Sequence, residues 1–206
     1  MFNLFKSQKK IGGEIAYYNL TEWWLKTFNA QERDYIVETF KPLGGFGSSL
    51  ISGEIQYSSG SSVSLLSNLA GWFKNVKDRE IGYKLLSKAE KLITDSTEIL
   101  DIHFFYHNKI EFYYRFRDID QESLNIAIEA CKKQIEISPK AILAFRKEYR
   151  DQKFPMHTGY EQLAIILEKQ ERSDEAIGLC EKAKRQNWNG EWNERMARCA
   201  KKKMKI

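Results

Sequence analysis

Residues 159–186 constrain the fold of this chain more than any other stretch of its sequence. In the first half, large apolar residues recur at intervals of three and four, which places them on one face of a helix: Tyr160, Leu163, Ala164 and Leu167. A polar turn follows, and the second half carries a stripe of small residues: Ala176, Cys180 and Ala183. Large side chains opposite small ones let two helices pack closely. The stretch therefore predicts a helical hairpin.

This hairpin resembles the tetratricopeptide repeat (TPR), a helix–turn–helix unit of about 34 residues with the pattern W-x2-L-G-x2-Y, then A-x3-F, then P. The seven residues named above match it in one register, and Trp188 stands in place of the closing proline. The resemblance implies an all-α fold, in which antiparallel helical hairpins stack as a short TPR-like α-solenoid. In such proteins the first helices of the hairpins line a concave groove that holds a peptide or a partner helix.

Two further stretches, 61–94 and 108–141, fit the same unit less completely. The first has matching residues in both helices (Leu66, Leu69, Ala70, Phe73, Gly82, Leu86 and Ala89). The second has matching residues mainly in its second helix (Ala127, Cys131 and the closing Pro139). Within it Gln134 stands where a small residue is expected, and Glu111 and Arg115 replace apolar and small residues. We expect hairpins across residues 61–190, with a linker over 141–156, and a shifted or extended helix around Phe112.

The first sixty residues predict a helical hairpin and a loop. Residues 14–42 carry two apolar helical segments, separated by Asn29 and Glu32, which have the spacing of a capping box. The pair Trp23 and Trp24 is expected to pack this hairpin onto the repeats, with a role as a partner-binding anchor as the alternative. We divide the chain into 1–60 and 61–206, joined as one compact unit.

Residues 43–62 interrupt every helical pattern, because they contain five glycines and seven serines. We expect an irregular connection or lid, with a short β-hairpin turning near Ser52 and Gly53 as an alternative. Gly44, Gly45 and Gly47 suggest a phosphate-binding loop, but the lysine of a P-loop and a clear preceding strand are both missing.

The positive charge of the chain is concentrated at its C-terminus. Residues 184–206 hold eight basic and two acidic residues, a net charge of +6, whereas the whole chain carries +5. Trp192, Met196 and Cys199 fall on one helical stripe, as in a helix that caps the open end of a solenoid. The alternative is a nucleic-acid-binding face on the same helix, formed by Arg195, Arg198, Lys202 and Lys205.

Compartment and membrane signals are weak in this sequence. Three cysteines without CxxC spacing favour buried, reduced thiols in a cytoplasmic protein. No apolar run reaches the length of a membrane span. The start, MFNLFKSQKK, lacks the pattern of a signal peptide, and we expect a short helix or a frayed end there. Contact of that end with a membrane surface is the alternative.

The sequence contains no motif that indicates catalysis. His103 and His107 are spaced for one helical face, near Asp101 and Glu111, which makes zinc binding one hypothesis for this helix. The HExxH motif and a third nearby histidine are missing, which favours a polar helix face instead. No serine or cysteine lies in a nucleophile motif. We therefore expect no enzymatic activity, no cofactor and no metal site.

The TPR resemblance implies a protein–protein interaction module that binds a peptide or partner helix. Its groove-facing positions are Lys74 in the first unit, Lys109, Phe112 and Phe116 in the second, and Glu161 and Ile165 in the third. Packing of Phe112 and Phe116 against the N-terminal hairpin is the alternative for those two. The family's clamp for a C-terminal carboxylate is missing, because Ser67, Gly71, Tyr113, Thr158 and Gln162 occupy its positions.

Overall fold

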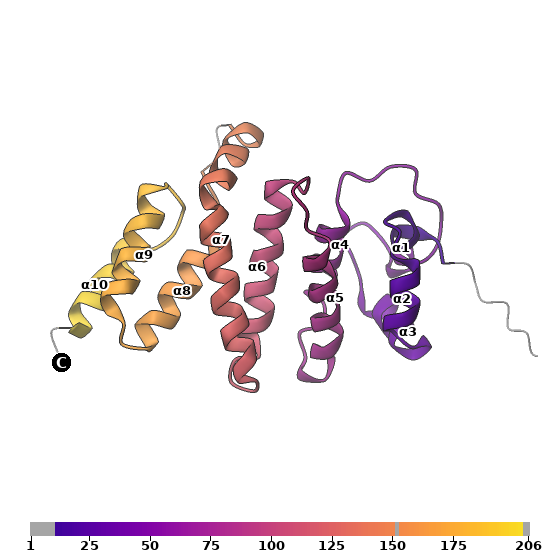
Figure 1. Cartoon of the computed structure of the whole chain (residues 1–206), viewed down its shortest axis with the longest axis horizontal. Coiled ribbons are helices and arrows are strands. Elements are labelled where there is room, and N and C mark those ends of the chain that lie inside the picture. Colours follow the sequence, from indigo (N-terminus) through magenta and orange to yellow (C-terminus); the bar gives the residue numbers. More distant parts are fainter. Residues whose placement is uncertain (1–10, 151–152, 204–206) are drawn as a thin grey trace, which may run out of the picture.

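The structure is a computed structural model that describes residues 11–150 and 153–203, and it confirms the all-helical prediction. Ten α-helices and two 3-10 helices (η) are found in this part of the chain, which contains no strand (Figure 1). In order they are α1 (Gly13–Tyr17), α2 (Thr21–Thr27), α3 (Ala30–Thr39), η1 (Gly47–Leu50), α4 (Ser62–Ala70), η2 (Val76–Asp78), α5 (Arg79–Lys91), α6 (Ile99–Arg115), α7 (Gln121–Glu148), α8 (Thr158–Lys169), α9 (Ser173–Arg185) and α10 (Trp192–Lys203).

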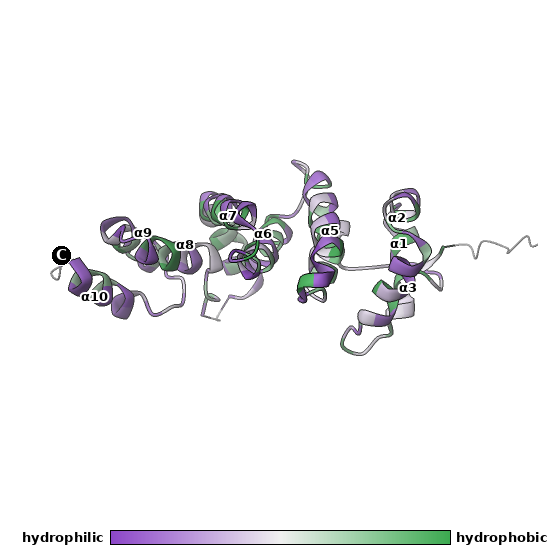
Figure 2. Ribbon diagram, turned by 90° about the horizontal axis from the view of Figure 1, so that it is seen from below, coloured by the Kyte–Doolittle hydropathy of each residue, from purple (hydrophilic) through white to green (hydrophobic). Residues whose placement is uncertain are grey.

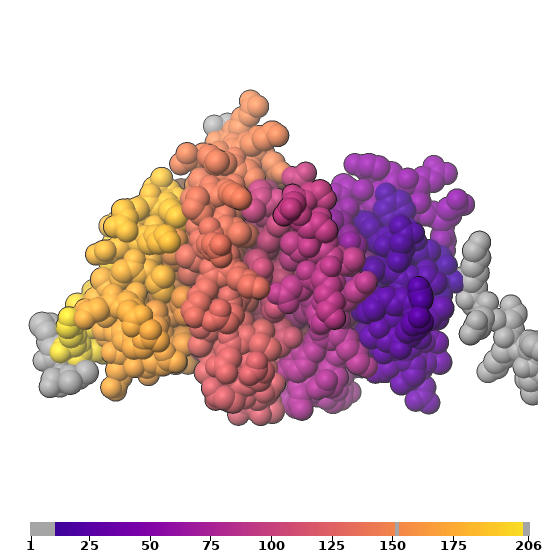
Figure 3. All heavy atoms as spheres, viewed as in Figure 1, coloured from indigo at the N-terminus to yellow at the C-terminus, as the bar shows by residue number. Residues whose placement is uncertain are grey.

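The helices follow one another along the long axis of the molecule, from α1–α3 at one end to α10 at the other (Figure 2). The space-filling view shows the same order, because segments adjacent in sequence stay adjacent in space (Figure 3). Consecutive helices pack in pairs: α4 on α5, α6 on α7, and α8 on α9. The first helices α4, α6 and α8 also contact one another in succession, and α10 packs on α9.

Local sequence explains where several helices begin. At α3, the Asn29 side chain accepts a hydrogen bond from the Glu32 amide at 2.9 Å, and the Glu32 carboxylate accepts one from the Asn29 amide at 2.8 Å. The predicted capping box is therefore confirmed. Ser61 and Ser64 form the same reciprocal pair at the start of α4. The Asp120 side chain accepts from the Glu122 amide to begin α7.

The predicted end of the second helix near Pro139 is wrong, because α7 continues through this proline to Glu148. A proline inside a helix removes one backbone hydrogen bond. Here the following turns are held by burial of Ala141, Ile142 and Phe145 in the core. Much of the expected linker over residues 141–156 is thus the C-terminal part of a longer helix.

The alternative of a β-hairpin within residues 43–62 is also wrong, because this segment contains η1 and otherwise irregular backbone. Its carbonyl groups are satisfied elsewhere: Ile51 and Gly53 accept hydrogen bonds from the amides of Gly12 and Gly13, both at 2.8 Å. The segment packs against the start of α1 instead of pairing with itself. Gly47 is required there, since a Cβ atom at this position would overlap the backbone of α3.

Side chains of α2 and α3 connect the N-terminal helices to the helices that follow. Trp24 is fully buried and packs on Phe28 at a centroid distance of 5.1 Å, whereas Trp23 is only partly buried. The Tyr35 hydroxyl donates to the Asp78 carboxylate at 3.0 Å. Lys84 of α5 pairs with Glu32 at 3.1 Å. The division of the chain at residue 60 stays a prediction.

Within residues 11–150 and 153–203, no helix has both the length and the apolar character that a membrane span needs. The prediction for the first ten residues lies outside this part of the chain, as does Lys205.

Candidate partner-binding surface

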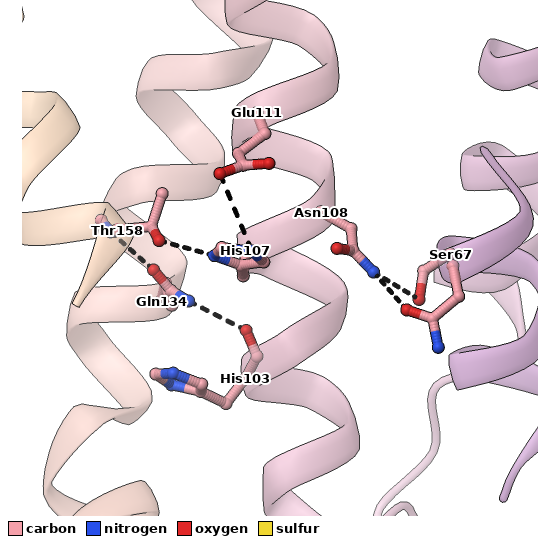
Figure 4. A network of polar contacts seen from close by, with 9 residues as sticks. Ser67, His103, His107, Asn108, Glu111, Gln134 and Thr158 are labelled. Carbon is pink, nitrogen blue, oxygen red and sulfur yellow. Dashed lines mark hydrogen bonds and ion pairs between the residues drawn. The ribbon is translucent and has the colours of Figure 1, made fainter. Parts of the chain in front are cut away.

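Helix α6 is joined to the first helices on both sides by polar side chains (Figure 4). Asn108 donates to the Ser67 hydroxyl at 3.3 Å and to the Asn68 side-chain oxygen at 2.8 Å, both on α4. Nδ1 of His107 is hydrogen-bonded to the Thr158 hydroxyl of α8 at 2.6 Å. Nε2 of His107 lies 3.8 Å from the Glu111 carboxylate, one turn further along α6. We call five of these residues the polar row: Asn68, His107, Asn108, Glu111 and Thr158.

The polar row is partly open to solvent. Asn68 and Glu111 are exposed, and the other three are half-buried. These residues come from α4, α6 and α8, so a single ligand lying across them would contact three consecutive hairpins. Phe104 and Arg115, one turn before and after the row on α6, are exposed as well. The outward face of α6 therefore combines an aromatic ring with amide, carboxylate and guanidinium groups.

Gln134 of α7 lies beneath this surface and connects three helices. Its amide nitrogen donates to the His103 carbonyl at 2.9 Å, and its side-chain oxygen accepts from the Gly159 amide at 2.6 Å. The side chain is fully buried. Glycine at position 159 allows this close approach, since a Cβ atom there would lie 2.9 Å from the backbone carbonyl oxygen of Cys131 and 2.8 Å from the Gln134 oxygen. Gln134 departed from the repeat pattern because it makes these contacts to α6 and α8.

A buried aromatic cluster surrounds Trp188, at the end of the α8–α9 hairpin. The Trp188 indole stacks on His103 with a centroid distance of 5.6 Å and an interplanar angle of 11°. His157 and Phe145 contact the same indole edge-on. Burial lowers the pKa of His103 to about 4 and of His157 to about 3, because a charged imidazole would lose its hydration, and the neighbouring imidazoles add to the effect. Both rings are neutral at pH 7.

The two histidines that suggested zinc do not share a ligand position. The His103 ring belongs to the Trp188 cluster, whereas His107 reaches Thr158 on α8. In the part of the chain that the structure describes, no three histidine, cysteine or carboxylate side chains come together as they would around a metal ion.

Phe112 and Phe116, predicted to face a groove, are buried, with 4% and 1% of their surface exposed. Both rings pack edge-on against Tyr83 of α5, and a Cβ atom at Gly82 would overlap the Phe112 ring. They therefore belong to the core, packed on α5 and not on the N-terminal hairpin, and we remove them from the candidate surface.

Lys109 shares this inward side of α6, where it pairs with Glu90 of α5 at 2.6 Å and leaves 12% of its side chain exposed. The predicted register of α6 was one position off. Of the residues one position earlier, Glu111 and Arg115 are exposed where Phe112 and Phe116 are buried, and Asn108 is half-buried.

The other three predicted contact residues remain accessible. Lys74 is exposed, but it follows the end of α4 and lies in the turn before η2. Glu161 and Ile165 are half-buried on α8. They follow Thr158 of the polar row by three and seven positions in the sequence. A binding role for these three residues stays a prediction.

The basic residues of α10 converge on one carboxylate of α8. Glu168 lies 3.1 Å from Arg195, 3.0 Å from Lys202 and 4.0 Å from Arg198. Burial alone would raise the pKa of Glu168, but the hydrogen bond and charge of Lys202, with the charges of Arg195 and Arg198, lower it overall. Arg195 is itself 9% exposed. This part of the proposed nucleic-acid face therefore fastens α10 to α8.

Sequence reasoning missed the polar row. A signal was available, because Asn108 and Glu111 are polar residues within an aromatic-rich segment, but such a helix offers several possible inward faces. No family model, curated protein or solved structure matches this chain.

Proposed function

We propose that this chain is a non-catalytic protein–protein interaction module, a TPR-like α-solenoid in which α4, α6 and α8 are the first helices. The observation that carries the proposal is the polar row, which spans these three helices at partial exposure. A surface of this kind offers hydrogen-bonding groups to a ligand while the scaffold below it stays rigid. The three cysteines are free and buried, which fits a reducing cytoplasm.

The partner we propose is a peptide or helix lying across α4, α6 and α8. Phe104 supplies an exposed apolar contact, and Glu111 favours a basic side chain opposite it. Half-buried Ile165 and Glu161 extend the same contact along α8. The inward-facing aromatic residues of α6 hold this face in place and do not touch the partner.

Charge reversal of Glu111 tests the proposal. The full-length chain serves as bait in a crosslinking pull-down read by mass spectrometry, with Glu111→Lys as the variant. Glu129→Lys is the matched control, because Glu129 is an exposed carboxylate on α7, away from the polar row. We expect a partner that wild type and the control retain and that Glu111→Lys loses at an unchanged melting temperature. Identical partner sets for all three proteins would contradict the proposal.

We do not propose that α10 binds nucleic acid. Arg195, Arg198 and Lys202 surround Glu168, so a phosphate would compete with an existing carboxylate for the same cations.

A further inference from the structure

A cleft is lined by residues at the C-terminal ends of α7 and α9 and in the loops that follow them. The C-terminal end of α7 projects beyond the neighbouring helices at one long edge of the molecule (Figure 1). We call the larger part of the cleft the basic pocket. It has a volume of about 540 Å³, and its described lining consists of two aromatic rings, Phe154 and Trp188, with four cations and two amides: Arg146, Arg150, Lys153, Lys184, Asn187 and Asn189. An isolated backbone bridge between Met156 and Asn189 holds the two sides of the cleft together.

A second cavity, the aromatic pocket, adjoins the first and has a volume of about 240 Å³. The described residues that line it are apolar except for one lysine: Phe104, Phe145, Tyr149, Lys153, Phe154 and Pro155. Phe104 and Tyr149 each leave 42% of their surface exposed. Lys153 and Phe154 line both pockets, so a cationic wall and an aromatic wall are continuous.

The described residues that line the basic pocket carry a net positive charge. Among residues 11–150 and 153–203, no carboxylate lines either pocket. Across residues 11–150 and 153–203, none of the four cations forms an ion pair, although Lys184 donates to the Asn193 side chain at 2.9 Å. The C-termini of α7 and α9 oppose this charge with about half a negative charge each. Four cations exceed what is needed to balance two helix ends.

We propose that this cleft binds single-stranded nucleic acid. Bases stack on Phe104 and Tyr149 in the aromatic pocket, while backbone phosphates lie among Arg146, Arg150 and Lys184. A positively charged groove beside exposed aromatic rings is the arrangement that single-stranded nucleic acids require, because every base has a flat face and every linkage has a charge.

An acidic or phosphorylated peptide is the competing ligand, and the structure favours it less. All four cations are exposed, so each contact to a single phosphate is weakened by water. A nucleic acid has a phosphate and a base in every unit, so it can occupy the basic pocket and the aromatic pocket at the same time. The site contains no residue of the polar row and shares only Phe104 with the proposed partner-binding surface, so variants at Arg150, Lys184 and Tyr149 test the cleft separately from that surface.

Fluorescence anisotropy of the full chain with labelled oligonucleotides tests this site. The probes are oligo-U and oligo-dT of about 12 nucleotides, a length within the range that single-strand-binding sites cover. Comparison of the affinities for the two probes shows whether the cleft prefers RNA or DNA. A blunt duplex and a phosphoserine peptide serve as competitors.

Two kinds of variant separate phosphate contacts from base contacts. We expect Arg150→Glu and Lys184→Glu to weaken binding about tenfold and to lower its salt dependence. Tyr149→Ala is expected to weaken binding about tenfold through lost stacking, with the salt dependence unchanged. Lys140→Glu on α7 and Arg185→Glu on α9 are the matched controls, since both residues are exposed and lie outside the pockets. The controls should bind within about twofold of wild type.

Three outcomes would overturn the proposal. The first is equal weakening by Arg150→Glu and Lys140→Glu, which would show diffuse attraction to a basic protein. The second is binding of the duplex as tightly as of the single strands. The third is binding of the phosphoserine peptide without binding of either oligonucleotide, which would assign the cleft to a peptide. The binding and the melting temperature of Arg150→Gln are measured beside those of Arg150→Glu. These measurements separate a loss of binding from a loss of folding.

Discussion

The hairpins α8–α9 and α6–α7 are both pairs of packed helices, but different side chains fill the contact between the two helices, which we call the seam. In α8–α9 the second helix presents small, fully buried residues, Ala176, Cys180 and Ala183, to a first helix with large ones. In α6–α7 the first helix is ringed by buried aromatic residues such as Phe105, Tyr113 and Phe116. A stripe of small residues therefore shows which face of a helix packs inward, whereas aromatic residues on several faces leave the inward face ambiguous.

Truncation should damage the aromatic seam most. Phe116→Ala removes a fully buried ring of α6, and we expect a loss of about 3–5 kcal/mol in the free energy of unfolding, measured by urea denaturation. Phe104→Ala on the same helix is the control, because its ring is 42% exposed and should matter clearly less. Equal losses for the two variants would mean that α6 is turned differently from the structure described here.

Acid should weaken the contact between the two hairpins, because His103 and His157 are buried where they meet. Their pKa values are lowered in the folded chain to about 4 and about 3, below the ordinary value of 6.5. The unfolded chain therefore takes up protons first as the pH falls below 6.5. Each histidine then removes about 1.4 kcal/mol of stability per pH unit, until the pH reaches its folded-state pKa.

The check on this prediction is urea denaturation of wild type and His157→Asn at about pH 7.5, 6 and 5, a range that spans the ordinary histidine pKa. Asparagine keeps an acceptor for the Tyr160 amide, to which His157 Nδ1 now bonds at 3.3 Å, and it does not titrate. The variant should lose less stability on acidification than wild type does. Matching pH slopes would show that His157 is not buried in its neutral form.

Enlargement should damage the small-residue seam. Ala183→Leu inserts volume where α9 packs closely on α8, and we expect a cost of about 1–3 kcal/mol in the free energy of unfolding. Ala197→Leu on α10 is the control, because Ala197 is exposed. If the two substitutions cost the same, the α8–α9 seam is looser than its small residues indicate.

Much of this architecture could be predicted from sequence because its signals are local. Periodicity indicated the helices of three hairpins, and Asn29 with Glu32 marked the start of α3. The register of α6 could not be predicted, because Phe112 is accommodated by Gly82 on another helix, far away in sequence. Continuation of α7 past Pro139 likewise depends on tertiary burial of Ile142 and Phe145. The polar row was missed for the same reason, since its neighbours are set by the fold.

The outward face of α6 should tolerate change better than either seam. Arg115→Ala removes an exposed side chain at the end of α6, and we expect the free energy of unfolding to change by no more than about 0.5 kcal/mol. Thermal unfolding monitored by circular dichroism measures this change in the free energy of unfolding. A loss as large as that of Phe116→Ala would place Arg115 in the core.

The most direct test of the central claim, that Glu111 faces outward and Phe112 inward, is the reactivity of cysteines introduced at these two positions. The native thiols provide a slow baseline, because all three are buried and burial raises the pKa of Cys131 to about 12 and of Cys180 to about 11. In the folded chain, Glu111→Cys should react with a thiol reagent as fast as a free thiol, and Phe112→Cys should be protected. Rapid reaction of Phe112→Cys with protection of Glu111→Cys would contradict the account and restore the register first predicted from the sequence.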